Sequence, residues 1–269
     1  MSTLAASPTT TTEPILLQAI SGGIATLTLN RPRNYNALSG AMLTELQSAL
    51  DAIAANDAVR VVVIAGSGPA FCAGHDLKEM RGNPRKDFYD TLFAQCSRFM
   101  LTLASLPQPV IARVHGIATA AGCQLVAACD LAVASENAKF ATSGINVGLF
   151  CSTPAVALSR NLSRKRAMEM LLTGDFIDAE TARDYGLVNR VVPLEQLDAE
   201  VGRLASSIIA KSPVAVATGK RMFYPQLEAG LEDAYRQAAD AMACNMMAED
   251  AGEGIDAFMA KRPAVWKGR

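Results

Sequence analysis

The chain has 269 residues, half of them apolar, with 25 basic and 26 acidic side chains and a formal net charge of −1 at pH 7. This length and apolar content suffice for a large hydrophobic core and exclude an intrinsically disordered protein. The balanced charge excludes a protein that binds nucleic acid through its overall field. The longest apolar stretch, residues 110–134, is interrupted by Arg113, His115, Gln124 and Asp130, so we expect no membrane span.

The six cysteines lie among apolar or small residues, with no CxxC pair and no histidine at ligand spacing. This pattern indicates reduced thiols, no metal site and a cytoplasmic protein. The first dozen residues are rich in Ser, Thr, Ala and Pro, and they match neither a secretory signal nor an Arg-rich transit peptide. We therefore expect a disordered tail over residues 1–14.

The first part of the folded chain predicts an α/β fold. Two strands, 15–20 and 24–29, flank a Ser21-Gly22-Gly23 turn typical of a hairpin. Ser39 can cap a helix whose apolar residues recur at helical spacing. The run VRVVVIA at 59–65 then predicts a fully buried strand. A strand, helix, strand order with such apolar strands is typical of parallel pairing.

The alternation continues with a helix, a strand, a short helix and a strand at 87–105, 110–114, 121–129 and 131–134. Asp130, at the start of the last of these strands, is expected to cap or pair locally. One more strand is predicted at 188–192, and further helices at 163–172, 179–185, 194–210, 214–226, 231–247 and 254–261. Because no linker or repeat divides the chain after residue 15, we expect a core over 15–192 and a helical region over 193–269.

Two turns made of small residues are the candidate sites of chemistry. One lies in residues 71–78 (FCAGHDLK) and the other in 118–124 (ATAAGCQ), where it opens the short helix. Small residues in the first turn of a helix let an oxygen approach unpaired N–H groups at the positive end of the dipole. Two such amides that converge form an oxyanion hole, which stabilises the enolate of a thioester. The alternative is that the small residues serve only tight helix–strand packing.

Five segments along the chain resemble the enoyl-CoA hydratase/isomerase, or crotonase, superfamily. They are NRPRNYNAL (30–38), FCAGHDLKEM (71–80), PVIARVHGIATAAGCQLVAACDLAVAS (109–135), LLTGDFIDAETARDYGLV (171–188) and GIDAFMAKR (254–262). The resemblance implies a crotonase-like spiral of ββα units with a C-terminal helical subdomain. It also implies that the terminal helices cover the active site and mediate a homotrimer or a dimer of trimers.

The resemblance assigns roles to individual positions. The backbone N–H groups of His75 and Ala121 match the two donors of the oxyanion hole. Coenzyme A, present only as part of the substrate and not as a permanently bound cofactor, is expected along Asn34, Tyr35, Asn36, Cys72, Ala73, Asp76, Leu77 and Lys78. Phe258 and Lys261 match positions near the adenine and phosphates that a neighbouring subunit can supply. For Lys78 and Lys261 the alternative is a solvated surface charge, and for Phe258 it is simple helix packing.

The departures from the family pattern concern acid–base chemistry. A hydratase uses two glutamates to hold water and move its protons, but here those positions are Gln124 and Gly144. Ser152 stands where other members of the superfamily carry a catalytic carboxylate. Cys151 is more simply a packed thiol than a nucleophile, and His75 can contribute its ring or only its amide. His115 is expected to be structural.

We therefore expect an acyl-CoA or enoyl-CoA protein of this superfamily that polarises a thioester carbonyl but departs from two-glutamate hydration. The alternative from another class is an acyl-CoA-binding protein without turnover. A weaker alternative is a thioesterase acting through Cys151 or Ser152. The acyl chain and the reaction stay open at this stage.

Overall fold

The computed structural model describes residues 13–269 and places them around two sheets. The larger sheet has six strands in the order β1-β2-β3-β5-β7-β10. Its strands are β1 (Leu16–Ser21), β2 (Ile24–Leu29), β3 (Val61–Gly66), β5 (Val110–Val114), β7 (Leu131–Ser135) and β10 (Arg190–Val192). β1 and β2 form the predicted antiparallel hairpin, and every other neighbouring pair is parallel. The expected disordered tail lies outside the described residues, except for Glu13 and Pro14.

A second sheet of four short strands was not predicted from the sequence. It consists of β4 (Ala70–Cys72), β6 (Ile117–Thr119), β8 (Lys139–Ala141) and β9 (Ile177–Asp178), in that order. The chain passes from β3 to β4, from β5 to β6 and from β7 to β8, so each turn adds one strand to each sheet. This alternation confirms the ββα spiral. Strands of two or three residues are too short to leave a period-2 pattern.

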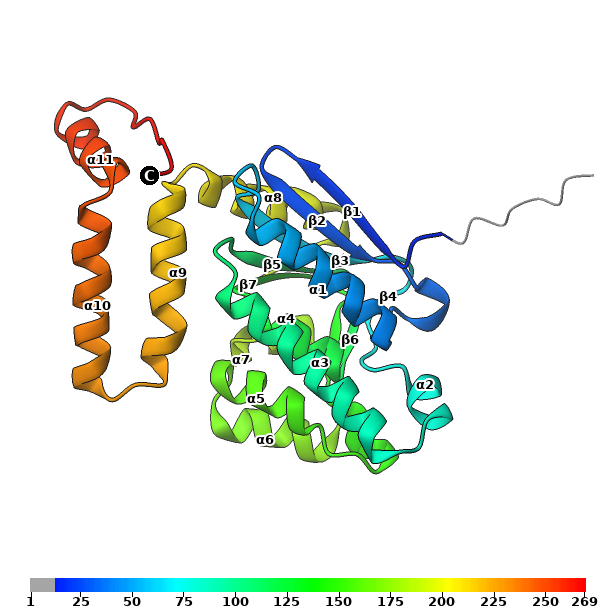
Figure 1. Ribbon diagram of the computed structural model, residues 1–269. Coiled ribbons are helices and arrows are strands. Elements are labelled where there is room, and N and C mark those ends of the chain that lie inside the picture. The colour runs from blue at the N-terminus through cyan, green and yellow to red at the C-terminus, as the bar shows by residue number, and fades with distance from the viewer. Residues whose placement is uncertain (1–12) are drawn as a thin grey trace, which may run out of the picture.

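Most of the helices cover the spiral on its outside (Figure 1). α1 (Gly40–Ala54) begins at Ser39, whose hydroxyl accepts from the Met42 amide at 3.2 Å. The other helices of the core are α2 (Leu77–Gly82), α3 (Lys86–Ser105), α4 (Ala121–Ala128), α5 (Ser152–Asn161), α6 (Arg164–Thr173) and α7 (Ala179–Tyr185), with 3-10 turns at Pro32–Asn34 and Ser143–Val147. α2 and α5 were not predicted from the sequence. Almost every residue of α4 is buried, which makes this helix the centre of the core.

After β10 the only secondary structure in the described chain is helical, as expected, and residues 260–269 follow the last helix as a non-helical segment. A 3-10 turn (Leu194–Gln196) leads into α8 (Leu197–Ile209), which packs on the large sheet through Leu197, Val201 and Ala205. α9 (Pro213–Leu227), α10 (Leu231–Met246) and α11 (Glu249–Met259) then form an arm that stands away from the spiral (Figure 1). α10 packs on α9 and α11. The arm does not cover the spiral of its own chain, so coverage of an active site by a neighbouring copy stays a prediction.

The base of the arm is tied to the core through Asp130. Lys220 of α9 donates from Nζ to Asp130 Oδ2 at 2.6 Å, and the hydroxyl of Tyr224 donates to Oδ1 at 2.6 Å. The Val110 amide also donates to Oδ2, at 2.7 Å. The expectation that Asp130 pairs only locally is therefore wrong, because its main partners come from a helix about 90 residues away in the chain. None of the helices in the described part of the chain is long and apolar enough to cross a bilayer.

Candidate functional site

The two small-residue turns meet at the N-terminus of α4. Gly74 has φ +91°, a left-handed conformation that a side chain would strain. A Cβ on Gly74 would come within 2.9 Å of the Ala120 Cβ and 3.1 Å of the Ala121 amide nitrogen. Ala120, just before the helix, also has a positive φ, of 51°. The glycine therefore provides both the turn and the close approach that brings His75 beside the first residue of α4.

The alternative reading of these small residues, tight packing, is also correct. A Cβ on Gly122 would lie only 2.0 Å from the carbonyl oxygen of Cys72. The helix can therefore rest on β4 only if this residue is glycine. The contact between α4 and β4 therefore has two consequences. It packs the helix tightly, and it directs the backbone amides at the N-terminus of α4 toward the 73–75 turn.

The backbone N–H groups of His75 and Ala121 donate to no other atom among residues 13–269. Leu38 bonds to the residues on both sides of His75. Its amide donates to the Gly74 carbonyl at 2.7 Å, and its carbonyl accepts from the Asp76 amide at 3.2 Å. These two bonds fix the backbone on either side of His75 and leave its own N–H unused. The Ala121 N–H is one of the unpaired donors at the positive end of α4.

The ring of His75 is held in an apolar setting. It meets the ring of Phe93 on α3 edge to face, with centroids 5.3 Å apart. Burial lowers the pKa of His75 to about 4, so the imidazole is neutral near pH 7. Its Nε2 atom is buried and has no hydrogen-bond partner within the described residues. The neighbouring Asp76 does not bond to this ring, because its carboxylate accepts from Arg31 and from the amides of Lys78 and Glu79.

The two positions that carry glutamates in hydratases differ here: position 124 keeps a polar side chain, and position 144 has none. Gln124 is 4% exposed, and its Oε1 atom is buried without a partner in the described chain. Its carboxamide does not titrate. Gly144 lies in the 3-10 turn, where a Cβ would be 2.7 Å from the Leu149 carbonyl oxygen and 2.8 Å from the Cys151 Sγ atom. The loop has thus closed over the space that a side chain at position 144 would need.

Within the described part of the chain, no activating base is bonded to the two nucleophile candidates, Cys151 and Ser152. Burial raises the pKa of the Cys151 thiol, so little thiolate is present near pH 7. Ser152 is exposed at the start of α5, and its hydroxyl donates to the Phe150 carbonyl at 3.4 Å. Thr142 is buried, and its hydroxyl donates to the Met170 carbonyl at 2.6 Å, so its role is structural.

Two residues expected beside coenzyme A bond through their side chains to the backbone around the site. Asn36 is fully buried, and its Nδ2 donates to the carbonyls of Ser67 and Ala70 at 2.8 Å. Asp76 caps α2 by accepting from the amides of Lys78 and Glu79. Burial opposes ionisation of Asp76, but the hydrogen bond from Arg31 and the α2 amides outweigh it and lower its pKa. Arg31, whose Nη2 lies 2.9 Å from Asp76 Oδ2, was not predicted from the sequence.

The other coenzyme A candidates divide into two groups. The Tyr35 carbonyl accepts from the Ala73 amide at 3.0 Å, so the loop at Asn34–Asn36 adjoins the 73–75 turn. Cys72 is buried below this turn, while Tyr35, Leu77 and Lys78 are exposed around it. Phe258 and Lys261 are exposed at the end of α11. In one chain α11 lies far from α2 (Figure 1), so the structure does not bring these two residues to the site.

Solved structures share this fold over nearly the whole chain. A crystal structure of enoyl-CoA hydratase from Mycobacterium smegmatis is 59% identical, with a TM-score of 0.93, and covers 94% of this chain and 99% of its own. A crystal structure of human enoyl-CoA hydratase domain-containing protein 3 is 45% identical, with a TM-score of 0.92, and covers 94% of this chain and 100% of its own.

Sequence relatives correct the expected location. The rat enoyl-CoA hydratase domain-containing protein 3 is 49% identical over 244 residues, which are 91% of this chain and 81% of the relative. It and the human relative are named mitochondrial, which contradicts the expectation of a cytoplasmic protein. Reduced thiols indicate a reducing environment but do not distinguish between reducing compartments. The profile of the family described as enoyl-CoA hydratase/isomerase matches residues 19–269. The chain therefore belongs to the enoyl-CoA hydratase/isomerase family.

Proposed function

We propose that the chain binds an acyl-CoA thioester with the carbonyl oxygen between the N–H groups of His75 and Ala121. The observation that supports this most is that neither amide has a partner among residues 13–269, while their backbones are brought together by Gly74. Donors arranged in advance stabilise the negative charge that develops on a thioester oxygen, because they need no reorganisation when the charge appears. The dipole of α4 adds to this effect at Ala121.

Coenzyme A would extend from this point along the loop at Asn34–Asn36 and past Leu77 to Lys78. Lys78 is exposed and makes no ion pair within the described chain, so it is free to meet a phosphate. Phe258 and Lys261 would meet the adenine end from a second copy of the chain, because they are remote from the site in their own. This arrangement requires the homotrimer or dimer of trimers that the family resemblance implies.

The same site supports hydration poorly. Each general acid or base typically contributes about 10²–10⁴-fold to a rate. Gln124 cannot move a proton at neutral pH, Gly144 has no side chain, and the neutral His75 ring is a weak base with a pKa of about 4. We therefore propose that the chain polarises a thioester carbonyl but lacks the two-glutamate mechanism.

A non-catalytic acyl-CoA-binding protein is the second candidate. The closed loop around Gly144 favours it, because the space for the second glutamate is filled by Leu149 and Cys151. A thioesterase is disfavoured by the raised pKa of Cys151 and by the absence of any base bonded to Ser152 in the described chain.

Calorimetry with butyryl-CoA and an absorbance assay with crotonyl-CoA test the proposal together. We expect butyryl-CoA to bind and crotonyl-CoA to be hydrated at least about 10²-fold more slowly than by a two-glutamate hydratase. Gly74→Val should abolish binding because it displaces the His75 amide, while His75→Ala keeps this amide and should retain most of the affinity. Failure to bind butyryl-CoA contradicts the thioester site. Hydration at an ordinary rate contradicts the proposed loss of acid–base chemistry.

A further inference from the structure

The end of the chain, residues 260–269, forms a strap that runs back along α11 (Figure 1). After the helix the backbone reverses at Lys261, whose φ is +53°. Arg262 then pairs with Glu253 of α11 through two hydrogen bonds, of 2.6 and 2.8 Å. The Val265 amide donates to the same carboxylate at 2.8 Å. We call residues 260–269 the C-terminal strap.

Asp250, in the first turn of α11, holds the far end of the C-terminal strap. This residue is 2% exposed, and its carboxylate accepts from the Lys267 amide at 2.7 Å and from the Gly268 amide at 3.2 Å. The hydroxyl of Ser212, the residue that caps α9, donates to the same carboxylate at 2.6 Å. The Asp250 amide in turn donates to the Arg269 carbonyl at 3.1 Å. One buried carboxylate therefore joins the start of α11, the strap and the start of α9.

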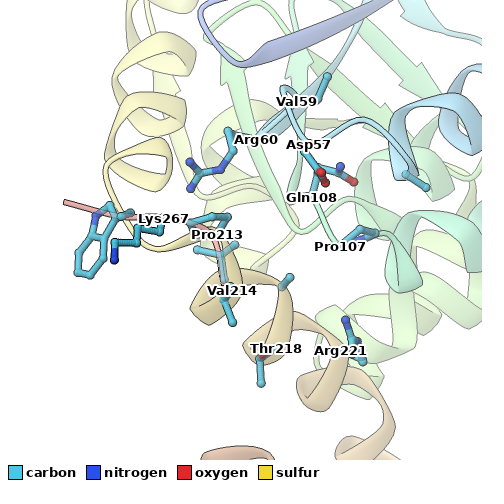
Figure 2. Close-up of a pocket in the computed structure, with 15 residues that line it drawn as sticks. Asp57, Val59, Arg60, Pro107, Gln108, Pro213, Val214, Thr218, Arg221 and Lys267 are labelled. Carbon is cyan, nitrogen blue, oxygen red and sulfur yellow. The ribbon is translucent and has the colours of Figure 1, made fainter. Parts of the chain in front are cut away.

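Trp266 connects the C-terminal strap to the end of α8. Its indole Nε1 donates at 2.8 Å to the carbonyl of Ala210, which directly follows α8. The ring also lies against α11, because a Cβ on Gly254 would come within 3.2 Å of it. Figure 2 shows the next residue, Lys267, beside Pro213 at the start of α9. The strap therefore attaches α11 to the corner between α8 and α9, where the arm leaves the spiral.

Within one chain, α11 has little else to hold it. Of its 11 residues, only Asp250 and Ala257 are buried. It also packs less closely on α9 and α10 than these two helices pack on each other. The position of a helix in a protein depends mainly on its tertiary contacts, and for α11 the strap supplies most of them. The strap therefore determines where the other end of α11 lies, and this end carries the exposed side chains of Phe258 and Lys261.

We propose that Asp250 and the C-terminal strap are positioning groups for coenzyme A, which hold Phe258 and Lys261 where the ligand of a second copy meets them. The proposal rests on the proposed function, in which these two residues contact the adenine end from another copy. Contacts that are fixed before binding cost less entropy when the ligand arrives. Because Asp250 and the strap act at the adenine end, they affect the affinity for coenzyme A and leave the contacts of the thioester unchanged.

Two ligands separate the adenine end from the thioester. Butyryl-CoA carries both, whereas S-butyryl-pantetheine carries the thioester without phosphates or adenine. Calorimetry with the full-length protein measures both affinities. Asp250→Asn places an N–H group where the strap and Ser212 donate, and it should weaken butyryl-CoA binding at least about tenfold, because charge-assisted contacts with the phosphates are displaced. The affinity for S-butyryl-pantetheine should not change.

Asp256→Asn is the matched control, because Asp256 is an exposed acid on the same helix. This variant should bind both ligands as wild type does. Circular dichroism checks that the Asp250→Asn variant is folded, and light scattering should give the mass of wild type. Glu253→Gln is a milder variant on the more exposed side of the strap. It should show the same selective loss, and it decides the question if Asp250→Asn does not fold.

A double-mutant cycle tests whether Asp250 acts through Phe258 and Lys261. Phe258→Ala together with Lys261→Ala should weaken butyryl-CoA binding and leave S-butyryl-pantetheine binding unchanged. Adding Asp250→Asn to this pair should cause little further loss, because changes to residues that act through one another are not additive. Fully additive losses would show that Asp250 does not position these two residues.

The outcomes distinguish this inference from the proposed function. Wild type that binds neither ligand would contradict the proposed function, and the inference would fail with it. Wild type that binds both ligands equally tightly would overturn the inference alone, because the protein would then gain nothing from the adenine end. An Asp250→Asn variant that loses affinity equally for the two ligands, that loses none, or that dissociates into monomers would also overturn the inference and leave the thioester site standing.

Discussion

Lys220 of α9 and Asp130 at the start of β7 form a buried ion pair, with Nζ and Oδ2 2.6 Å apart and side-chain exposures of 6% and 14%. The ammonium also donates to the carbonyls of Leu103 and Gln108, at 2.8 and 3.0 Å. Its three protons are thus all used. This pair fixes the position of α9 on the spiral, and the rest of the arm extends from it.

Lys220→Met is expected to lower the free energy of unfolding by about 3–5 kcal/mol, because it leaves Asp130 and two carbonyls buried without their cation. Chemical denaturation measures this difference. Lys86→Met removes the exposed pair with Asp90, which has a similar N–O distance of 2.7 Å, and should cost less than about 1 kcal/mol. Equal losses in the two variants would show that Lys220 does not anchor the arm.

The spiral illustrates what the sequence could and could not predict. The strands of the large sheet were predicted because runs such as 59–65 are apolar on both faces and long enough to stand out. The second sheet was missed because β4, β6, β8 and β9 are two or three residues long and take their partners from distant turns of the chain. Likewise Asp130 was assigned a local partner, since nothing in its neighbourhood indicates Lys220.

At the candidate site, the family motifs and the small residues identified the two turns. They could not indicate that a Cβ at Gly144 would meet Leu149 and Cys151, or that Arg31 holds Asp76. Both facts depend on how loops approach one another in space. The sequence also could not indicate where Phe258 and Lys261 lie. Within one chain they are far from the candidate site, although the family resemblance assigns them to it.

Gly144→Ala should destabilise the fold by about 1–3 kcal/mol, as overpacking does, because its Cβ has contacts below 3 Å with a backbone oxygen and a sulfur. Thermal and chemical unfolding measure the loss. The double variant Gln124→Glu with Gly144→Glu carries both glutamates of a hydratase. Because of the crowding at Gly144, we expect this variant to gain little hydratase activity. A stable and active double variant would show that the 143–149 turn can open.

The buried ring of His75 should make stability depend on pH. Its pKa is about 4 in the folded protein, below the ordinary value of 6.5. Between these values the unfolded chain binds a proton that the folded chain does not, so stability rises with pH across this window. The contribution is complete above about pH 6.5 and is lost as the pH falls toward 4, by at most about 3 kcal/mol.

The free energy of unfolding of wild type and His75→Phe, measured from pH 4 to 7, isolates this effect. The variant should show a shallower slope, because phenylalanine does not titrate, while His115 contributes equally to both proteins. Parallel slopes would mean that the His75 ring can be protonated in the folded protein without penalty.

The apolar surface of the arm predicts self-association. Met242, Met246, Met247 and Phe258 are between 52% and 86% exposed in one chain, which is more apolar surface than an isolated helical pair normally shows to water. Light scattering at micromolar protein should give the mass of a trimer or hexamer. Trp266 does not belong to this surface, because it is partly buried and its Nε1 donates to the Ala210 carbonyl of its own chain at 2.8 Å. A monomer would contradict the proposed supply of Phe258 and Lys261 by a second copy.

The infrared stretch of a thioester carbonyl labelled with carbon-13 tests the oxyanion hole most directly, since hydrogen bonds to the oxygen lower its frequency. Labelled butyryl-CoA bound to wild type and to His75→Ala should absorb at lower frequency than free butyryl-CoA, because both proteins keep the amides of residues 75 and 121. A bound thioester with an unshifted carbonyl would contradict the proposal that these two amides polarise it.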